Sequence, residues 1–320
     1  MRVAVTGASG FIGGQVARRL VTGGHHVVGY GRRADSGLPE HPDLEYRRWD
    51  IARPLPGDDP GVDAVVHCAG SVTEWGSDEE FDSANVTGTR NVLEAFAGAR
   101  AFVHMSSASV YDLVATKSDI SEDAPLARAY LSGYVRSKIA AEAVVMRSRP
   151  DAVILRPHIV YGPGDNKILP RLLDFRRRAG TVFVPGNGRN RLSLTHVENL
   201  AAAVELALGS RHSGVFNVAD ALRATVDELL LQLHQAFRLR PRIIHVPLRA
   251  AWVAAGASEA LHKAVLPHRS PVLNRFVVAQ IAYDFTLDCT RAERLLGYRP
   301  RREYPEAFEA LAGRRPLLAC

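Results

Sequence analysis

Short apolar runs alternate with amphipathic stretches over the first half of this chain. The apolar runs have the length and β-branched composition of buried strands, and they lie at residues 1–6, 26–30, 44–49, 62–70 and 101–106. Helices are predicted between and after them at residues 15–21, 78–98 and 133–149. Because strand and helix alternate, the crossovers must be right-handed and the strands parallel, which predicts a sheet covered on both faces.

A glycine-rich turn joins the first strand to the first helix. Gly7, Gly10 and Gly13 follow the spacing GxxGxxG. A glycine at each position permits the tight turn, the close approach of a pyrophosphate and the close packing of the helix, while the first-turn amides of the segment Ser9–Ile12 (Ser9, Gly10, Phe11 and Ile12) face an anion. The pattern predicts a dinucleotide site, and the alternative is a turn that only joins strand to helix.

Beyond residue 164 the pattern becomes less regular. We predict helices at 166–178 and 225–237, a strand and loop at 182–191, a strand of the main sheet at 214–218, and apolar segments that roof the site at 251–266 and 276–285. The predicted fold is α/β, a Rossmann-type doubly wound parallel sheet with a smaller, mostly helical C-terminal substrate lobe. Residues 1–164 and 192–220 form the first unit, and residues 165–191 and 221–320 the second.

Composition excludes several classes of protein. A chain of 320 residues with 47% hydrophobic content can bury a large core. Its 40 Lys and Arg exceed its 34 Asp and Glu, for a net charge of +6, but the two signs are interleaved, which argues against a nucleic-acid partner. The longest apolar stretch, residues 247–267, contains Arg249, Glu259, His262 and Lys263, so it predicts an amphipathic helix and not a membrane span.

Compartment and metal content follow from two further features. No leader precedes the first strand, so we expect a cytoplasmic protein. The three cysteines, Cys68, Cys289 and Cys320, lack metal-ligand spacing. We therefore predict unpaired, inert thiols and no metal site.

The residues after the second strand bear on the choice of cofactor. Dinucleotide folds often place an acidic residue there for the ribose 2′-hydroxyl, but this chain has Gly31, Arg32 and Arg33. A guanidinium pairs with a 2′-phosphate that a carboxylate would repel, so NADP is favoured over NAD. Asp35 lies slightly further on and leaves NAD open, and two solvated arginines are the alternative interpretation.

Other cofactor contacts are predicted at the ends of the third and fourth strands. Asp50 and Ile51 flank the adenine position, and Ala69 and Gly70 are small enough for close ligand approach.

Three residues form the candidate catalytic group. Ser107 follows the fifth strand, and Tyr134 and Lys138 are four residues apart on one helix face. A phenol is a poor base at neutral pH, and a neighbouring ammonium lowers its pKa. Ser107 can donate a hydrogen bond to the same substrate oxygen. A half-buried structural tyrosine is the alternative interpretation of Tyr134 alone.

These motifs resemble those of the extended short-chain dehydrogenase/reductases. Residues 6–13 match the family's TGxxGxxG loop, Ser107 its active-site serine, and Tyr134 with Lys138 its YxxxK. The segment 155–165, including Pro157 and Val160, looks like the stretch whose backbone lies beside the nicotinamide. The resemblance implies that Tyr134 exchanges a proton with the substrate, that Lys138 also contacts the nicotinamide ribose, and that helices matching residues 78–98 and 134–149 form a homodimer.

The branch of the family is less directly indicated. Sugar-nucleotide enzymes of this type carry an arginine that grips a diphosphate, and the matching position is Leu192, with Ser193 at the acidic position. Residues 190–199 and 285–300 resemble the 3β-hydroxysteroid dehydrogenase-like reductases instead. Candidate substrate contacts are Trp75, Ser109, Tyr111, His158, Ile168, Arg191 and Tyr283, each of which could equally be a core or surface residue.

We therefore predict an NADP(H)-dependent carbonyl reductase or alcohol dehydrogenase that acts on a small or apolar keto or hydroxy substrate. Two alternatives stay open. One is a nucleotide-sugar epimerase or dehydratase that retains its cofactor through turnover. The other is a non-catalytic NADP-sensing protein, which typically lacks the Tyr-Lys pair.

Overall fold

The computed structural model describes residues 1–57, 61–173, 180–266 and 269–313. Seven strands form the main sheet in the order β12-β7-β5-β4-β1-β2-β3. Their bounds are β1 Arg2–Thr6, β2 His26–Gly31, β3 Leu44–Arg48, β4 Ala64–His67, β5 Ala101–Met105, β7 Val153–Pro157 and β12 Gly214–Val218. Every neighbouring pair is parallel, which confirms the predicted Rossmann-type sheet.

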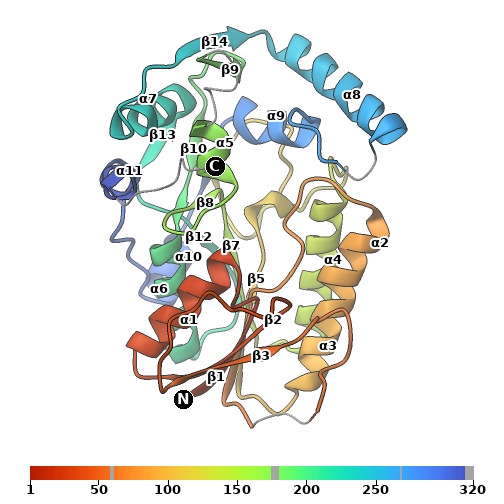
Figure 1. Ribbon diagram of the computed structural model, residues 1–320, viewed down its shortest axis with the longest axis vertical. Coiled ribbons are helices and arrows are strands. Elements are labelled where there is room, and N and C mark those ends of the chain that lie inside the picture. Colours follow the sequence, from red (N-terminus) through yellow and green to blue (C-terminus); the bar gives the residue numbers. More distant parts are fainter. Residues whose placement is uncertain (58–60, 174–179, 267–268, 314–320) are drawn as a thin grey trace.

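Helices cover both faces of this sheet (Figure 1). On one face α1 (Phe11–Thr22) and α6 (Val197–Gly209) pack together, and Leu20 and Leu200 belong to the same buried cluster. On the other face α3 (Gly88–Ala95) packs against α4 (Gly133–Ser148), and their residues Val92 and Val145 share a second cluster. The near-continuous apolar strands are buried on both sides, as a parallel sheet requires.

The predicted helix 78–98 is interrupted. It begins as α2 (Asp78–Phe81), continues as a π-helical segment from Asp82 to Thr87, and resumes as α3. A capping box between Ser77 and Glu80 starts it. Single π turns inside helices often occur at functional sites, and this one contains Asn85, whose side chain is buried.

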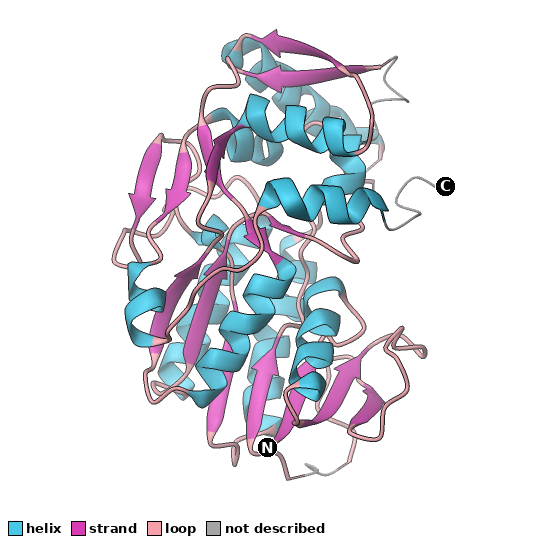
Figure 2. Cartoon of the chain, turned by 90° about the vertical axis from the view of Figure 1, so that its left-hand side faces the viewer, coloured by secondary structure: helices cyan, strands magenta, loops and turns pink. Residues whose placement is uncertain are grey.

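A second lobe lies beyond the carboxyl ends of the main sheet (Figure 2). Its helices are α5 (Ile168–Leu173), α7 (Val226–Ala236), α8 (Leu248–Val265), α9 (Arg275–Ala282) and α11 (Tyr304–Gly313). Part of the predicted helix 166–178 lies outside the described residues.

Short strands complete this lobe. One sheet has the order β13-β10-β15-β6 (β13 Arg223–Thr225, β10 Arg191–Ser193, β15 Phe285–Leu287, β6 Lys117–Ile120), and two pairs are β9 (Thr181–Pro185) with β14 (Arg242–Val246) and β8 (Val160–Tyr161) with β11 (Thr195–His196). The lobe therefore contains more strand than the sequence indicates. Six of these strands have only two to four residues, which is too short to show a period, and among the strands of five residues only β9 lies in a region predicted as strand.

The division into two units stays a proposal, and two contacts refine it. β6 comes from the first predicted unit but pairs with β15 of the second lobe. Conversely, α10 (Thr290–Leu295) contacts β12, and Ala292 and Tyr298 lie in the main core. These contacts favour assigning α10 to the dinucleotide unit.

A buried ion pair joins α4 to β7. The Arg156 Nε and Nη2 atoms donate to Glu142 at 2.9 and 2.6 Å, and Ser106 Oγ also donates to Glu142. Arg156 further donates to the hydroxyl of Tyr111 at 2.9 Å, and its guanidinium lies 4.9 Å from the centre of that ring. The two charged side chains are 4% and 0% exposed, so each one offsets the free-energy cost of removing the other's charge from water.

Arg156→Met should destabilise the fold by about 3–5 kcal/mol, because it leaves Glu142 buried without its counter-charge. Arg302→Met is the matched control, since the Arg302–Glu198 pair is exposed and worth at most about 1 kcal/mol. Urea unfolding followed by circular dichroism measures both. Equal losses in the two variants would contradict a special role for the buried pair.

Candidate active site

The glycine loop has the conformation that its spacing predicts. Gly7 has a φ of +72°, and a Cβ there would lie 2.8 Å from the backbone nitrogen of Ala69. A Cβ on Gly13 would overlap the carbonyl oxygen of Gly7, so the start of α1 packs directly on the turn. No side chain caps α1 at Gly10. Its first amides therefore remain available to an anion such as a pyrophosphate.

The segment that follows β7 lies beside the glycine loop and the start of α1. Gln15 Nε2 donates to the carbonyl of Pro163 at 2.9 Å, and Gly164 approaches the ring of Phe11. The segment that follows β7, with Pro157 and Val160, is thereby held beside the start of α1. The backbone of this segment therefore lies close to the start of α1, where the family resemblance leads us to expect the dinucleotide.

The arginines after β2 are exposed, and their backbones are fixed. Tyr46 donates its hydroxyl proton to the carbonyl of Arg33 at 2.8 Å, and Arg48 Nε donates to the carbonyl of Arg32 at 3.1 Å. Asp35 is tied into its own turn, where it accepts from the amide of Gly37 at 2.8 Å. The nearest carboxylate is therefore engaged, while the described chain offers no hydrogen bond or ion pair to either guanidinium.

The other predicted cofactor residues lie at strand ends on the same edge. Asp50 is exposed, whereas Ile51 is buried and its carbonyl accepts from Asn91 at 2.7 Å. The amide of Ala69 donates to Thr6 Oγ1 at 3.2 Å. A Cβ on Gly70 would lie 2.6 Å from Asn85 Oδ1, so a side chain there would displace the Asn85 amide.

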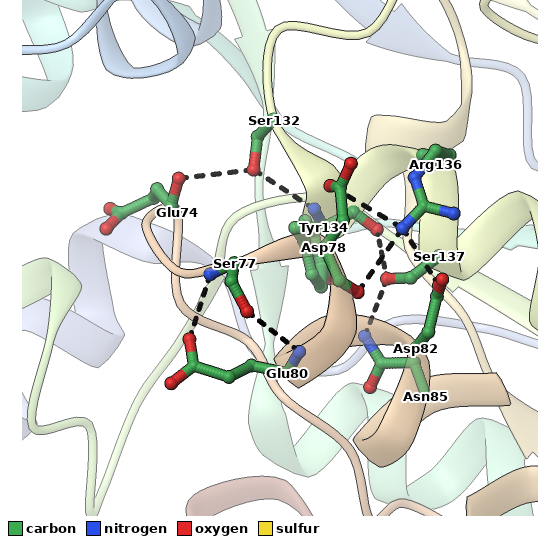
Figure 3. Close-up of polar contacts among 10 residues, drawn as sticks. All are labelled: Glu74, Ser77, Asp78, Glu80, Asp82, Asn85, Ser132, Tyr134, Arg136 and Ser137. Carbon is green, nitrogen blue, oxygen red and sulfur yellow. Dashed lines mark hydrogen bonds and ion pairs between the residues drawn. The ribbon is translucent and has the colours of Figure 1, made fainter. Parts of the chain in front are cut away.

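Ser107 and Tyr134 meet at the carboxyl end of β5. Ser132 caps α4 by accepting from the amide of Tyr134 at 3.1 Å, and it donates to the carbonyl of Glu74 at 3.1 Å (Figure 3). Tyr134 is only 9% exposed, and Ser107 lies close enough to its hydroxyl to lower the pKa of that group. Ser107 Oγ also donates to Ser109 Oγ at 3.1 Å.

The predicted lowering of the Tyr134 pKa is not found. Burial raises the pKa of Tyr134 above its usual value, and the hydrogen bond with Ser107 only partly opposes this effect. Lys138 Nζ instead donates to the carbonyl of Met105 at 2.8 Å. Sequence spacing placed both residues on one helix face but could not show which acceptor the ammonium reaches.

Burial also sets the direction in which the pKa of Lys138 is shifted. Removal from water lowers the pKa of Lys138 to about 8, and the charge of Glu142 one turn further along α4 acts in the opposite direction. This lysine therefore titrates close to neutral pH. Burial raises the pKa of Cys68 and of Cys289 to about 12, so both thiols are protonated and poorly reactive. Cys320 lies outside the described residues.

Asn85 is a site residue that the sequence analysis missed. Its Oδ1 accepts from the amide of Ser71 at 2.7 Å, and its Nδ2 donates to Ser137 Oγ at 2.8 Å. Figure 3 shows this side chain reaching from the π-helical segment to α4. Asn85 thus fixes the chain just beyond Gly70 relative to the catalytic helix. An asparagine in a helix interior, where it is unfavourable, was the available signal.

A layer of polar side chains lies beneath the site. Thr6 Oγ1 lies 2.8 Å from His67 Nδ1, and His67 Nε2 lies 2.9 Å from Thr89 Oγ1. Burial lowers the pKa of His67 to about 3. The neighbouring His104 is 1% exposed, and among the described residues neither of its ring nitrogens has a hydrogen-bond partner. Burial, followed by the charges of Lys138 and His67, lowers its pKa well below the usual value.

The seven candidate substrate residues divide into two groups. Trp75 lies against α8, with its ring 6.5 Å from that of His262, and Ser109 contacts Ser107. Ile168 begins α5, whose Arg171 pairs with Glu74 at 2.8 Å, close to Trp75 in the chain. These three lie on segments that surround the catalytic group.

The other four candidate residues make their contacts outside the catalytic group. Tyr111 is 1% exposed and donates to Asn217 at 2.9 Å, and His158 is 1% exposed with its ring 4.4 Å from that of Phe285. Arg191 is exposed at the start of β10, and Tyr283 lies between α9 and β15. Tyr111 and His158 are thus core residues. Leu192 is 3% exposed, so the position of the diphosphate-binding arginine is occupied by a buried aliphatic side chain.

Among the described residues, no group of His, Cys, Asp and Glu side chains could hold a metal ion. In the same parts of the chain, no helix combines the length and the apolar character needed to span a bilayer.

The model of the NAD dependent epimerase/dehydratase family matches residues 3–219. A 4-hydroxy-2-methyl-3-oxo-4-farnesyl-3,4-dihydroquinoline-1-oxide ketoreductase from Stigmatella aurantiaca is 30% identical, covering 97% of this chain and 96% of the relative. A 2-alkyl-3-oxoalkanoate reductase from Stenotrophomonas maltophilia is 28% identical, with 97% and 98% covered. The structure of a UDP-glucuronic acid 4-epimerase from Bacillus cereus with NAD superposes with a TM-score of 0.75 at 21% identity, covering 97% of each chain.

The chain therefore belongs to the NAD-dependent epimerase/dehydratase family, within the extended short-chain dehydrogenase/reductases. It is an NAD(P)-dependent enzyme of that type, as the motifs predicted. The likeness to the epimerase structure at this level of identity shows the fold alone.

His104→Leu should reduce the pH dependence of stability. The folded protein keeps this imidazole neutral, whereas the unfolded chain takes up a proton below pH about 6.5, so stability is lost as the pH falls through that value. The slope of the unfolding free energy between about pH 6 and 4.5 should be smaller by about 1.4 kcal/mol per pH unit than in wild type. His212→Leu, at an exposed position, is the control. An unchanged slope in His104→Leu would show that His104 is protonated in the folded state.

Proposed function

We propose that this enzyme is an NADP(H)-dependent carbonyl reductase or alcohol dehydrogenase for an apolar keto or hydroxy substrate. The convergence of Ser107, Tyr134 and Lys138 at the carboxyl end of β5, where Lys138 Nζ donates to the carbonyl of Met105 at 2.8 Å, carries the proposal. When bound, a nicotinamide would supply the hydride. A phenol is protonated at neutral pH, and burial keeps Tyr134 in that form, so it has a proton to donate in reduction.

The chain's own groups then have separate roles. Tyr134 donates its proton to the carbonyl oxygen of the substrate, and Ser107 donates a hydrogen bond to the same oxygen as negative charge develops there. Lys138 places a positive charge at the base of the site through its bond to Met105. The carbonyl carbon gains the hydride and the oxygen gains the tyrosine proton, so the product is the alcohol.

The surroundings of Tyr134 support an apolar substrate. Its ring meets Phe276 of α9 edge to face, with centroids 6.3 Å apart, in a buried cluster of aliphatic and aromatic side chains. Two relatives that match over nearly their whole length are named as a ketoreductase and an oxoalkanoate reductase. The buried Leu192 gives no support to a sugar diphosphate.

Tyr134→Phe should lower kcat by about 10²–10⁴, because the proton donor is lost while the ring is kept. The assay follows NADPH oxidation with a panel of 3-oxoalkanoates, apolar ketones and sugar nucleotides. Tyr130→Phe is the control, since Tyr130 is 46% exposed. Equal rates of NADPH oxidation in wild type and Tyr134→Phe would contradict the assignment as a reductase. A co-purifying nucleotide without net NADPH oxidation would favour an epimerase or dehydratase.

The double variant Arg32→Ser and Arg33→Ser should raise the KM for NADPH by about 10- to 100-fold and leave that for NADH nearly unchanged. The reason is that charge-assisted hydrogen bonds to the 2′-phosphate are lost. Arg147→Ser, exposed near the far end of α4, is the control. If both cofactors respond alike, the arginines do not select NADP.

We also infer a cytoplasmic homodimer. The family resemblance supports the homodimer, through helices that match residues 78–98 and 134–149, and of these α3 and α4 cover one face of the sheet.

A further inference from the structure

Helix α8 exposes an apolar face along its whole length. Val253, Leu261 and Val265 are 72%, 61% and 64% exposed. On a helical projection they share one side with five exposed alanines and no charged residue, namely Ala250, Ala254, Ala257, Ala260 and Ala264. We call these eight residues the α8 face. Figure 1 shows α8 at the outer edge of the second lobe.

The opposite side of α8 is anchored. Ala251 and Ala255 are buried in a cluster with Val278 of α9. Glu259 is 8% exposed and accepts from the backbone and side-chain nitrogens of Arg275, at 2.6 and 2.8 Å. Because an ion pair and a packed cluster fix this side, α8 cannot rotate to bury its apolar face.

Positive charges lie along one edge of the α8 face and just beyond its C-terminal end. Arg249, Lys263 and Arg269 are exposed, and the described residues provide no carboxylate partner for any of them. The one acidic residue of α8, Glu259, is buried and paired with Arg275. Leu266 and Val272, which are 42% and 64% exposed, follow α8 in the chain. An apolar stripe beside a cationic edge is typical of a helix that lies in a membrane interface.

We propose that the α8 face docks on the surface of a bilayer that contains anionic phospholipids. The apolar side chains would enter the boundary between head groups and acyl chains, and Arg249, Lys263 and Arg269 would contact the phosphates. The helix of 18 residues contains Arg249, Glu259 and Lys263, so it lies on the membrane and does not cross it.

Charge disfavours a second copy of the chain as the occupant. A two-fold contact between antiparallel α8 helices would bring Arg249 of one copy close to Lys263 of the other. Like charges at such a contact repel, whereas an anionic lipid surface attracts both.

The α8 face lies on the outer side of elements that reach the catalytic residue. Lys263 lies 6.0 Å from the centre of the Trp75 ring, α8 packs on α9, and Phe276 of α9 contacts Tyr134. Docking would therefore hold the site one helix layer from the membrane. The inference does not depend on the proposed reaction, because docking needs neither substrate nor cofactor.

Vesicle flotation with the full chain tests the proposal. Vesicles of phosphatidylcholine with and without phosphatidylglycerol are used, without nucleotide or substrate. Wild type should float with the anionic vesicles. The double variant Leu261→Glu and Val265→Glu should bind at least about tenfold more weakly, because two charges enter the apolar face. Arg249→Gln with Lys263→Gln should weaken binding to anionic vesicles by roughly fivefold per charge.

Leu206→Glu with Leu231→Glu is the matched control, since these leucines are 37% and 52% exposed on α6 and α7. It should bind as wild type does, and unchanged circular dichroism confirms folding of each variant. Absence of wild-type binding, or equal binding by the α8 face variant, overturns the proposal. So does a change of oligomeric state in that variant without any vesicle binding, which assigns the face to self-association.

Discussion

The orientation of α4 depends on the buried ion pair between Glu142 and Arg156. Glu142 follows Lys138 by one turn and Tyr134 by two, so all three lie close to one helix face. Arg156 lies near the end of β7 and grips Glu142 with two nitrogens. A buried pair of this kind adds little stability compared with apolar residues of the same volume, but its geometry is strict. Its main effect is therefore to fix the rotation of the helix that carries the phenol and the ammonium.

Burial, more than any neighbouring charge, sets the protonation of the site. Removal from water raises the pKa of Tyr134 and lowers those of Lys138, His67 and His104. Each shift favours the neutral form, as expected when desolvation dominates. A neutral phenol beside Ser107 has a proton to donate. The imidazoles of His67 and His104 are neutral as well, so they add no positive charge next to Lys138.

The two lobes contact different parts of the candidate site. The glycine loop packs directly on neighbouring backbone, so Gly7 and Gly13 tolerate no side chain, and Gln15 ties the segment after β7 to it. The second lobe meets the site through side chains such as Phe276, which contacts Tyr134, and His262, which contacts Trp75, and such side chains can differ between enzymes without altering the sheet. This separation explains how ketoreductases and epimerases share one architecture.

Local spacing determined the parallel sheet, the glycine loop and the Tyr134–Lys138 pair, because each depends on residues within one turn or one strand. Tertiary structure decided the rest. Asn85 and Ser137 are 52 residues apart, and Glu142 and Arg156 join a helix to a strand, so no local period marks either pair. Tyr111 and His158 proved to be core residues, and α8 buries Glu259 while it exposes Leu261. A sequence pattern shows which side chains share a face, but only packing determines which surface that face meets.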